Sequence, residues 1–269
     1  MRTMHSFIFV ISIVSMTTYG YLTRANVGGT HNVFARQEED PIDYTAQDYV
    51  MDGLVSMWDG IENAGWGLHE DSPQYWSDLV GEDYMAKTGS ANTYYPTYFT
   101  ENGLCGIAYN HWPSKSQRLY SALIGTERTV EVVFTRTYMG NTVGLPNFTG
   151  NNWLSMQGFS GASMLCYHEG AGFWVTPPIQ TAPVTFSLTW VVEDGKCHVY
   201  VNGMLQSTVN SGGMSVPNNS IMTLGQNIGL VNGTSYFAAL THSVRIYSKA
   251  LSDAEVKANL TVDRGRFGL

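Results

Sequence analysis

Short segments of alternating apolar and polar residues follow one another along most of the chain, separated by Gly, Pro, Asn or Asp. This pattern is typical of the antiparallel strands of an all-β sandwich. Residues 61–84 lack such a pattern and are predicted to form a long loop. The predicted strands span residues 53–60, 93–99, 118–123, 129–137, 152–157, 162–168, 172–177, 185–193, 196–201, 204–209, 221–224 and 236–247.

Two dipeptides, Asp194-Gly195 and Asn202-Gly203, interrupt an otherwise alternating stretch over residues 185–209. Asp, Asn and Gly tolerate the positive φ that both central positions of a type I′ turn require. The sequence therefore predicts three neighbouring strands joined by two tight turns.

Near the C-terminus, the alternation of SVRIY gives way to signals for the start of a helix. Ser252 and Glu255 have the spacing of a capping box, in which each side chain accepts a hydrogen bond from the backbone of the other residue. These signals predict one short helix near residues 252–262, with Val256 and Leu260 on its inward face. A helix this short is stable only when it packs against another element.

The composition supports a folded domain and argues against two classes of protein. Charged residues make up 13% of the 269 residues and hydrophobic residues 43%, which argues against a disordered chain. The formal net charge is -8, and no run of basic residues occurs. Because phosphate contacts need clustered Lys and Arg, we expect no nucleic-acid partner.

The N-terminal residues 1–25 resemble an export signal. Residues 7–16 form an apolar run that is too short to span a membrane but suits the core of a secretory signal peptide. Gly20 and Ala25 are candidate cleavage positions. Such a signal, or a short anchor, predicts a secreted or cell-surface protein. The alternatives are an N-terminal arm in an assembly such as a virion, and a misassigned start.

The next residues, 26–48, contain Gly28-Gly29, an acidic run and Pro41, and lack hydrophobic periodicity. We expect a linker here that is flexible or wraps around an edge. Residues 49–269 are then the folded domain, and their number suits a single β-sandwich.

Four blocks of this domain resemble laminin-G-like (LamG) domains of the concanavalin A-like lectin and glucanase superfamily. WVVEDGKCHVYVNGMLQ is similar to the central three strands of such domains, and VRIYSKALSDAEV to their C-terminal strand and helix. LVSMWDG and TVEVVFTR resemble the opening strand and a later long strand. The resemblance implies a two-sheet jelly roll in which the first and last strands lie near one another and the helix crosses the sandwich.

The same superfamily includes glucanases, which carry closely spaced carboxylates on one strand. Neither E-x-D-x-x-E nor E-x-D-x-E occurs in this chain, and residues 137–192 contain a single charged side chain, Glu169. Asp59 and Glu62 follow the first predicted strand, where turn and surface roles are expected. No G-x-S-x-G motif occurs either. We therefore predict no catalytic residues and a protein that is not an enzyme.

The weakly charged middle of the chain is better suited to binding. Aromatic faces stack on sugar rings, and amides and hydroxyls form hydrogen bonds with sugar hydroxyl groups. We therefore predict a noncatalytic recognition or attachment module for a glycan or another cell-surface ligand. Aromatic residues on strands and Asn in turns also occur for purely structural reasons. The predicted ligand-binding residues are Asn152, Trp153, Tyr167, His168 and Trp174.

Other functions remain as alternatives to the glycan-binding hypothesis. Domains of this kind also occur in phage appendages and bacterial surface proteins, so a structural or host-attachment component of a virion or bacterial surface assembly is one alternative. A glycoside hydrolase is another. A homo-oligomer or a larger assembly is compatible with the attachment role.

No cofactor or metal site is predicted. The three cysteines, Cys105, Cys166 and Cys197, are far apart and form no C-x-x-C pair, which argues against a zinc site. They are compatible with one disulfide or with buried thiols. Some relatives use calcium, but Asp59, Asp78 and Asp83 form no recognisable oxygen-ligand motif.

Overall fold

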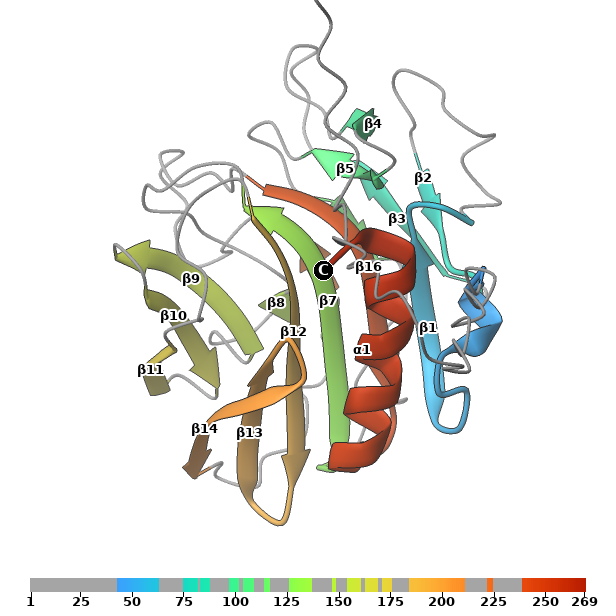
Figure 1. Ribbon diagram of the computed structural model, residues 1–269. Coiled ribbons are helices and arrows are strands. Elements are labelled where there is room, and N and C mark those ends of the chain that lie inside the picture. The colour runs from blue at the N-terminus through green and yellow to red at the C-terminus, as the bar shows by residue number, and fades with distance from the viewer. Residues whose placement is uncertain are drawn as a thin grey trace, which may run out of the picture. The chain divides into compact units, whose positions relative to one another are not determined.

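Antiparallel strands dominate the described part of the protein, and they form three hydrogen-bonded sheets (Figure 1). All described residues belong to the unit Pro41–Leu269. The computed structural model describes residues 43–62, 75–81, 83–87, 97–101, 104–108, 114–116, 126–136, 147–148, 154–160, 163–168, 171–175, 184–210, 222–224 and 239–269.

The largest sheet has eight strands in the order β14-β13-β12-β7-β16-β5-β4, and β1 also pairs with β16. The first described strand therefore lies beside the last one, as the family resemblance implies. The strands are β1 (Leu54–Asp59), β4 (Thr97–Glu101), β5 (Leu104–Ala108), β7 (Arg128–Arg136), β12 (Val184–Glu193), β13 (Lys196–Val201), β14 (Met204–Asn210) and β16 (Ala239–Tyr247).

Two smaller sheets contain the remaining described strands. The three-stranded sheet comprises β9 (Leu154–Ser160), β10 (Ser163–His168) and β11 (Ala171–Val175). The five-stranded sheet comprises β2 (Tyr75–Ser77), β3 (Tyr84–Lys87), β6 (Ser114–Ser116), β15 (Met222–Leu224) and β8 (Asn147–Phe148). The pairing is antiparallel in both, which confirms the all-β class with one short C-terminal helix.

Some strands differ from the sequence prediction. The loop predicted over residues 61–84 is wrong at β2, and β3, β5, β6 and β8 were not predicted. Several of these strands have two or three residues, which is too short for a period of two to be visible. The buried Trp76 of β2 donates from Nε1 to the carbonyl of Asp59 at 3.3 Å. The strand predicted at residues 118–123 lies outside the described residues.

The two predicted tight turns are confirmed. Asp194 and Gly195 have φ values of 46° and 69°, and Asn202 and Gly203 have values of 48° and 68°. Positive φ at both central positions is the requirement of a type I′ turn. β12, β13 and β14 are consequently neighbours in antiparallel register.

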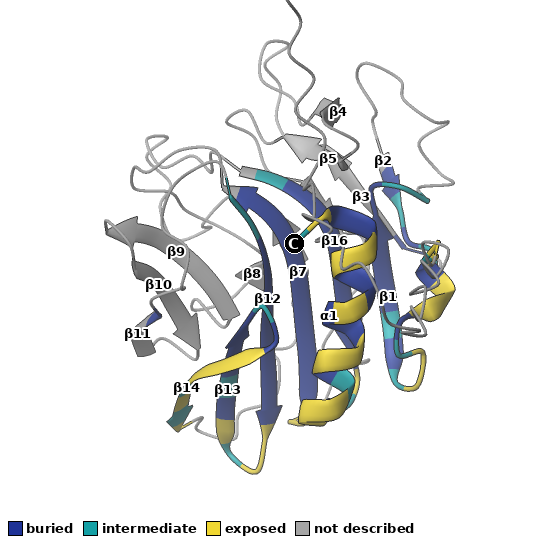
Figure 2. Ribbon diagram, viewed as in Figure 1, coloured by how far each residue is buried: buried dark blue, intermediate teal, exposed yellow. Residues whose placement is uncertain are grey.

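Strands β7, β12 and β16 of the eight-stranded sheet are buried over most of their length, and the two faces of these strands differ in chemistry. One face is apolar: Phe134 and Phe186 are paired across β7 and β12 with ring centroids 5.7 Å apart, and Trp190 is fully buried. The alternate positions of the same strands are polar, among them Glu131 and Ser187. Helix α1 (Asp253–Phe267) lies over this polar face and turns its exposed side outward (Figure 2).

The helix begins where the sequence predicts it. Ser252 is the N-cap and forms the expected capping box with Glu255. Val256 and Leu260 are 2% and 6% exposed, so both predicted inward residues are buried. The helix continues beyond residue 262 to Phe267 and ends at Gly268, which has the left-handed conformation typical of a C-cap.

The segment before β1 packs against this helix. A single 3₁₀ turn, Ala46–Asp48, is capped by Thr45. The Tyr49 hydroxyl donates to Asp263 Oδ1 at 2.8 Å, and the Val50 amide donates to Asn259 Oδ1 at 2.8 Å. The Ala46 amide also donates to Glu62 Oε1 at 2.7 Å, so the last residues of the predicted linker, residues 26–48, contact the folded domain. Residues 1–42, which include the predicted signal peptide, lie outside the described part of the chain.

Two further observations concern membrane-spanning helices and the cysteines. In the ranges that the structure describes, no helix has the length and apolar character needed to cross a membrane. Cys197 of β13 is fully buried, as expected for a thiol that packs as a small apolar side chain. Cys105 lies in β5 and Cys166 in β10.

The capping box predicts a pH-dependent contribution to stability. Hydrogen bonds from Lys249 and from the Ser252 backbone lower the pKa of Glu255 from 4.5 to about 2. Because the folded-state pKa lies below the unfolded one, this contribution is present above about pH 4.5 and is lost as the pH falls toward about 2. Glu255→Gln should therefore reduce the free energy of unfolding by about 1 kcal/mol near neutral pH, and the deficit should shrink in acid.

Urea denaturation at a series of pH values measures this deficit. Asp253→Asn is the matched control, because Asp253 carries an exposed ion pair with Lys257 in the same helical turn, and such pairs contribute about 0.3–0.5 kcal/mol. A deficit for Glu255→Gln that does not change with pH would contradict the assigned role of the carboxylate.

Candidate functional site

Three of the five predicted ligand residues lie in two paired strands. Tyr167 and His168 end β10, and Trp174 lies in β11. Tyr167 is the Cα partner of Gly172, and Trp174 is the partner of Leu165, two residues before Tyr167. The structure therefore brings Tyr167, His168 and Trp174 into one hairpin. Asn152 and Trp153 lie outside the described residues, so their place in a site stays a prediction.

The sheet that carries these residues has an unusual composition. The strands β9, β10 and β11 contain no Asp, Glu, Lys or Arg. They contain the aromatic residues Phe159, Tyr167, Phe173 and Trp174 together with Gln157 and several serines. Rings, amides and hydroxyls without charge can stack on and form hydrogen bonds with an uncharged polar ligand. At the end of β11, Val175 is 2% exposed and belongs to the core.

A cluster of buried charged side chains lies in another part of the described core, between the eight-stranded sheet and α1. Arg245 of β16 donates from Nε to Glu131 Oε2 at 2.8 Å and from Nη2 to Asp263 Oδ2 at 2.9 Å. Asn259 of α1 donates to the same oxygen of Glu131 at 2.8 Å. Ser187 of β12 donates to Asp263 Oδ2 at 2.9 Å. These bonds connect three strands to the helix.

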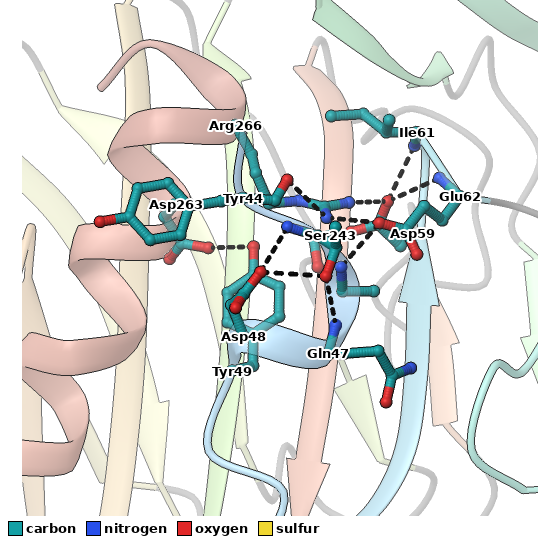
Figure 3. Close-up of polar contacts among 12 residues, drawn as sticks. Tyr44, Gln47, Asp48, Tyr49, Asp59, Ile61, Glu62, Ser243, Asp263 and Arg266 are labelled. Atoms are coloured by element: carbon teal, nitrogen blue, oxygen red, sulfur yellow. Dashed lines mark hydrogen bonds and ion pairs between the residues drawn. The ribbon is translucent and has the colours of Figure 1, made fainter. Parts of the chain in front are cut away.

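A second cluster surrounds Arg266 at the end of α1 (Figure 3). Its Nη2 donates to Asp59 Oδ1 at 2.7 Å, and its Nη1 donates to Glu62 Oε1 at 2.8 Å and to the Tyr44 carbonyl at 3.4 Å. Asp59 Oδ1 also accepts from the backbone amides of Ile61 and Glu62, at 2.9 and 3.0 Å. The turn role expected for Asp59 is confirmed, but Asp59 is fully buried, so the expected surface role is wrong for this residue.

Burial dominates the electrostatics of both clusters. It raises the pKa of Glu131 and of Asp59, and the positive charge of the arginine beside each carboxylate opposes this rise. Burial alone would lower the pKa of Arg245, but Asp263 and Glu131 outweigh it and hold that pKa above its usual value. Arg245 therefore carries its charge inside the core, where it needs both carboxylates as partners.

These acids are not arranged for glycoside hydrolysis. A retaining enzyme needs two carboxyl groups about 5 Å apart that both reach the sugar. Glu131 and Asp263 are 1% and 0% exposed, and both are hydrogen-bonded to Arg245 beneath the helix. A sugar cannot reach them while α1 is in place. Their role in this structure is to hold the helix on the polar face of the sheet.

The sequence alone did not predict this network of buried charges. Glu131 and Arg245 each interrupt a run of apolar residues in TVEVVF and SVRIY, which is the signal that could have indicated two buried, paired charges. Asn259 and Asp263 share the inward side of α1 with Val256, at helical spacings of three and seven residues.

Two of the aspartates considered as calcium ligands, Asp78 and Asp83, take part in hydrogen bonds with backbone groups. Asp78 Oδ1 accepts from the amides of Met57 and Val80 at 2.8 and 2.9 Å, and the Asp78 amide donates to the Asp83 carbonyl at 2.9 Å. Within the described ranges, no group of three or more His, Cys, Asp and Glu side chains could hold a metal ion. The expectation that the protein needs no cofactor stays a prediction.

Comparison with solved structures identifies the fold. A Trypanosoma rangeli sialidase in complex with sialic acid aligns with a TM-score of 0.53 and 14% identity, over 79% of this chain and 33% of the sialidase chain. Domain 4 of AbnA, an extracellular arabinanase from Geobacillus stearothermophilus in complex with arabinotriose, aligns with a TM-score of 0.53 and 17% identity, over 77% of this chain and 97% of that domain.

A third similar structure is that of botulinum neurotoxin type C, whose cell entry depends on interaction with two ganglioside molecules. It aligns with a TM-score of 0.53 and 10% identity, over 78% of this chain and 51% of the toxin chain. This chain thus spans about half or less of the sialidase and toxin chains. At these identities the likeness shows a shared fold alone.

Sequence comparison supports the same fold. No curated protein matches the chain in sequence. Residues 149–257 match the laminin-G family model described as the concanavalin A-like lectin/glucanases superfamily. The matched segment includes β9 to β16 and the first turn of α1. This match over residues 149–257 confirms, for that segment, the resemblance to laminin-G-like domains found in the sequence.

Proposed function

We propose that this protein is a noncatalytic module that recognises glycans through the sheet β9-β10-β11. The observation that carries the proposal is the composition of this sheet, which is rich in aromatic and hydroxyl side chains and contains no Asp, Glu, Lys or Arg. The sheet lies inside the segment that matches a superfamily of lectins and glucanases. The predicted ligand residues Tyr167, His168 and Trp174 come from its paired strands β10 and β11.

The acids of the described strands favour binding over hydrolysis. These strands contain four acidic residues, Asp59, Glu101, Glu131 and Glu193, and each lies on a different strand. The alternating carboxylates of a glucanase strand are therefore missing from the described sheets. Asp59 and Glu131 are in addition buried in the core, where each is ion-paired with an arginine.

The similar structures are consistent with a carbohydrate ligand. Two of them are complexes with sialic acid and arabinotriose, and the third is of a toxin whose cell entry depends on interaction with gangliosides. Two of them are parts of hydrolases, so a test of the proposal must measure hydrolysis as well as binding.

A glycan array and a reducing-end assay on the same polysaccharides provide this test. We expect binding to a subset of glycans and no release of reducing ends above a protein-free control. Release of reducing ends would overturn the noncatalytic assignment. Absence of binding to every glycan, with the protein in an ordered multimeric assembly, would instead support the structural or host-attachment alternative.

The proposed site is tested by substituting its aromatic residues. Trp174→Ala and Tyr167→Ala should each weaken binding of an array-identified glycan by about tenfold, because a lost stacking contact of about 1.4 kcal/mol corresponds to that factor. Met204→Ala is the matched control, because Met204 is 50% exposed and lies on β14 of the eight-stranded sheet. Titration calorimetry gives the affinities.

Circular dichroism and thermal melting must accompany the titrations. If both aromatic variants fail to fold, these rings are core residues and the site assignment is wrong. If both fold and bind as tightly as the Met204→Ala control, the ligand binds elsewhere on the domain.

A further inference from the structure

Cationic side chains are missing from the part of the chain that carries the proposed site. Between Arg136 and Lys196 the sequence contains no Lys or Arg, and its single acidic residue before Glu193 is Glu169. The described strands β9, β10 and β11 lie wholly within this interval. The residues of these strands therefore carry aromatic, amide and hydroxyl groups, with His168 as the one ionisable nitrogen base among them.

Several cations in the rest of the described chain are already committed to acidic partners. Arg245 and Arg266 are buried in the two clusters beneath α1. Lys249 contacts Asp52 and Glu255 at 2.5 and 2.8 Å, and Lys257 pairs with Asp253. These ion pairs lie on α1 and on the eight-stranded sheet with its adjoining loops, and each of these cations already has an acidic partner.

Outside the eight-stranded sheet, the described strands contain two lysines, Lys87 of β3 and Lys115 of β6. Both belong to the five-stranded sheet. An anionic ligand would therefore find its cations on a different sheet from the one that carries Tyr167 and Trp174.

The charge distribution decides which sugars this sheet can hold. Transferring a carboxylate or sulfate from water to a site without a cationic partner carries a large desolvation penalty. The formal net charge of -8 adds a long-range repulsion for anions. Neutral sugars have no such penalty, because their hydroxyls are satisfied by amides and hydroxyls and their apolar faces by aromatic rings.

We infer that the ligand class of the β9-β10-β11 sheet is neutral glycans, and that sialylated or sulfated glycans are excluded. This inference rests on the proposed function. The comparison structures leave the choice open, because they include complexes with both sialic acid and neutral arabinotriose.

Matched pairs of glycans test the inference with the full-length protein. Each pair shares one neutral core, presented plain and with a terminal sialic acid or a sulfate ester, and titration calorimetry measures both members. We expect the acidic member to bind at least about tenfold more weakly than the neutral one. Raising NaCl from about 50 to about 500 mM should change the affinity for the neutral member by less than about twofold, because screening acts on charges.

The outcomes separate this inference from the proposed function. Binding of acidic members alone, with an affinity that falls as salt rises, would overturn the neutral-ligand inference and leave glycan recognition intact. Loss of that binding in Lys115→Ala would then locate it on the five-stranded sheet. No binding to either member of any pair would overturn both. Binding of neutral members that is unchanged in Lys115→Ala supports both.

Discussion

Replacing Arg245 with methionine should lower the free energy of unfolding by about 3–5 kcal/mol, as expected when one partner of a buried ion pair is removed. We expect no larger loss from any other single substitution considered for this protein. Methionine fills much of the volume of the arginine stem, so the substitution removes the charge and the hydrogen bonds with little loss of packing.

The size of the effect follows from what Arg245 leaves behind. Glu131 and Asp263 are both buried and both lose their shared cation. The guanidinium also lies 3.9 Å from the centre of the Tyr49 ring, and its Nη1 donates to Ser243 Oγ at 3.2 Å. Two carboxylates without a cation repel one another, and one of them must take up a proton for the core to stay closed.

This protonation gives the substitution a specific pH dependence. Without Arg245, the folded-state pKa of the buried Glu131 should rise further above its unfolded value. A folded pKa above the unfolded one means that stability is present in acid and is lost as the pH rises through the folded pKa. The loss of unfolding free energy caused by Arg245→Met should therefore be smaller near pH 5 than near pH 8. The difference between the two pH values should lie roughly within the range of effects that single mutations have on stability.

Urea denaturation at both pH values measures the deficit. Arg264→Met is the control, because Arg264 is exposed on the same helix and its substitution should change stability by less than about 0.5 kcal/mol. Adding Glu131→Gln to Arg245→Met should recover part of the loss, because one unpaired charge is removed. A loss below about 1 kcal/mol for Arg245→Met would show that the network does not hold α1 on the sheet.

Local signals explain why the C-terminal helix could be predicted. The cap at Ser252 and the partner Glu255 act within one turn, so their spacing alone identifies the helix start. The same holds for Asp194-Gly195 and Asn202-Gly203, whose conformation depends on two adjacent residues. The inward face of α1 was predicted only in its apolar part, Val256 and Leu260.

The polar part of that face depends on contacts across the chain. Asp263 meets Arg245 and Ser187, and Asn259 meets Glu131, 128 residues away in the sequence. The pattern of a single sequence carries no information about such pairs. Because buried charged residues are rare, a charged residue in the sequence is normally predicted to be exposed. The short strand β2 was missed for a related reason, since long-range pairing rather than its own sequence defines it.

For the candidate site, the sequence predicted the strands but not the role of their side chains. Short segments bounded by turn residues indicated the strands, and the structure pairs β10 with β11, which joins Tyr167, His168 and Trp174. The alternation that marks a strand is the same for a core residue and for a ligand contact, so the role of these rings needs the binding measurements above.

Replacing Gly203 with alanine should lower the free energy of unfolding by about 2–3 kcal/mol, through backbone strain and overpacking together. Gly203 is the second central residue of the turn between β13 and β14, with φ at 68°. A Cβ at this position would lie 2.6 Å from Leu260 Cδ2 of the helix. Leu260 is 6% exposed, so its side chain has little room to move away.

Two variants separate the two causes. Gly268 has the same φ of 68°, and no atom lies within 4 Å of the position of its Cβ. Gly268→Ala should therefore show the backbone cost alone, about 1 kcal/mol. Adding Gly203→Ala to Leu260→Ala should likewise cost only about 1 kcal/mol more than Leu260→Ala alone, because the leucine methyl that would clash is already gone.

This set of variants tests whether α1 packs directly on the turn between β13 and β14. If Gly203→Ala costs no more than Gly268→Ala, Leu260 does not press on the turn, and the first half of α1 is held by the capping box and the polar network instead. A full loss of about 2–3 kcal/mol that falls to about 1 kcal/mol in the Leu260→Ala background places the helix directly on the β13-β14 turn. The glycine of the Asn-Gly turn is then required twice, because the turn needs its positive φ and the helix needs its missing side chain.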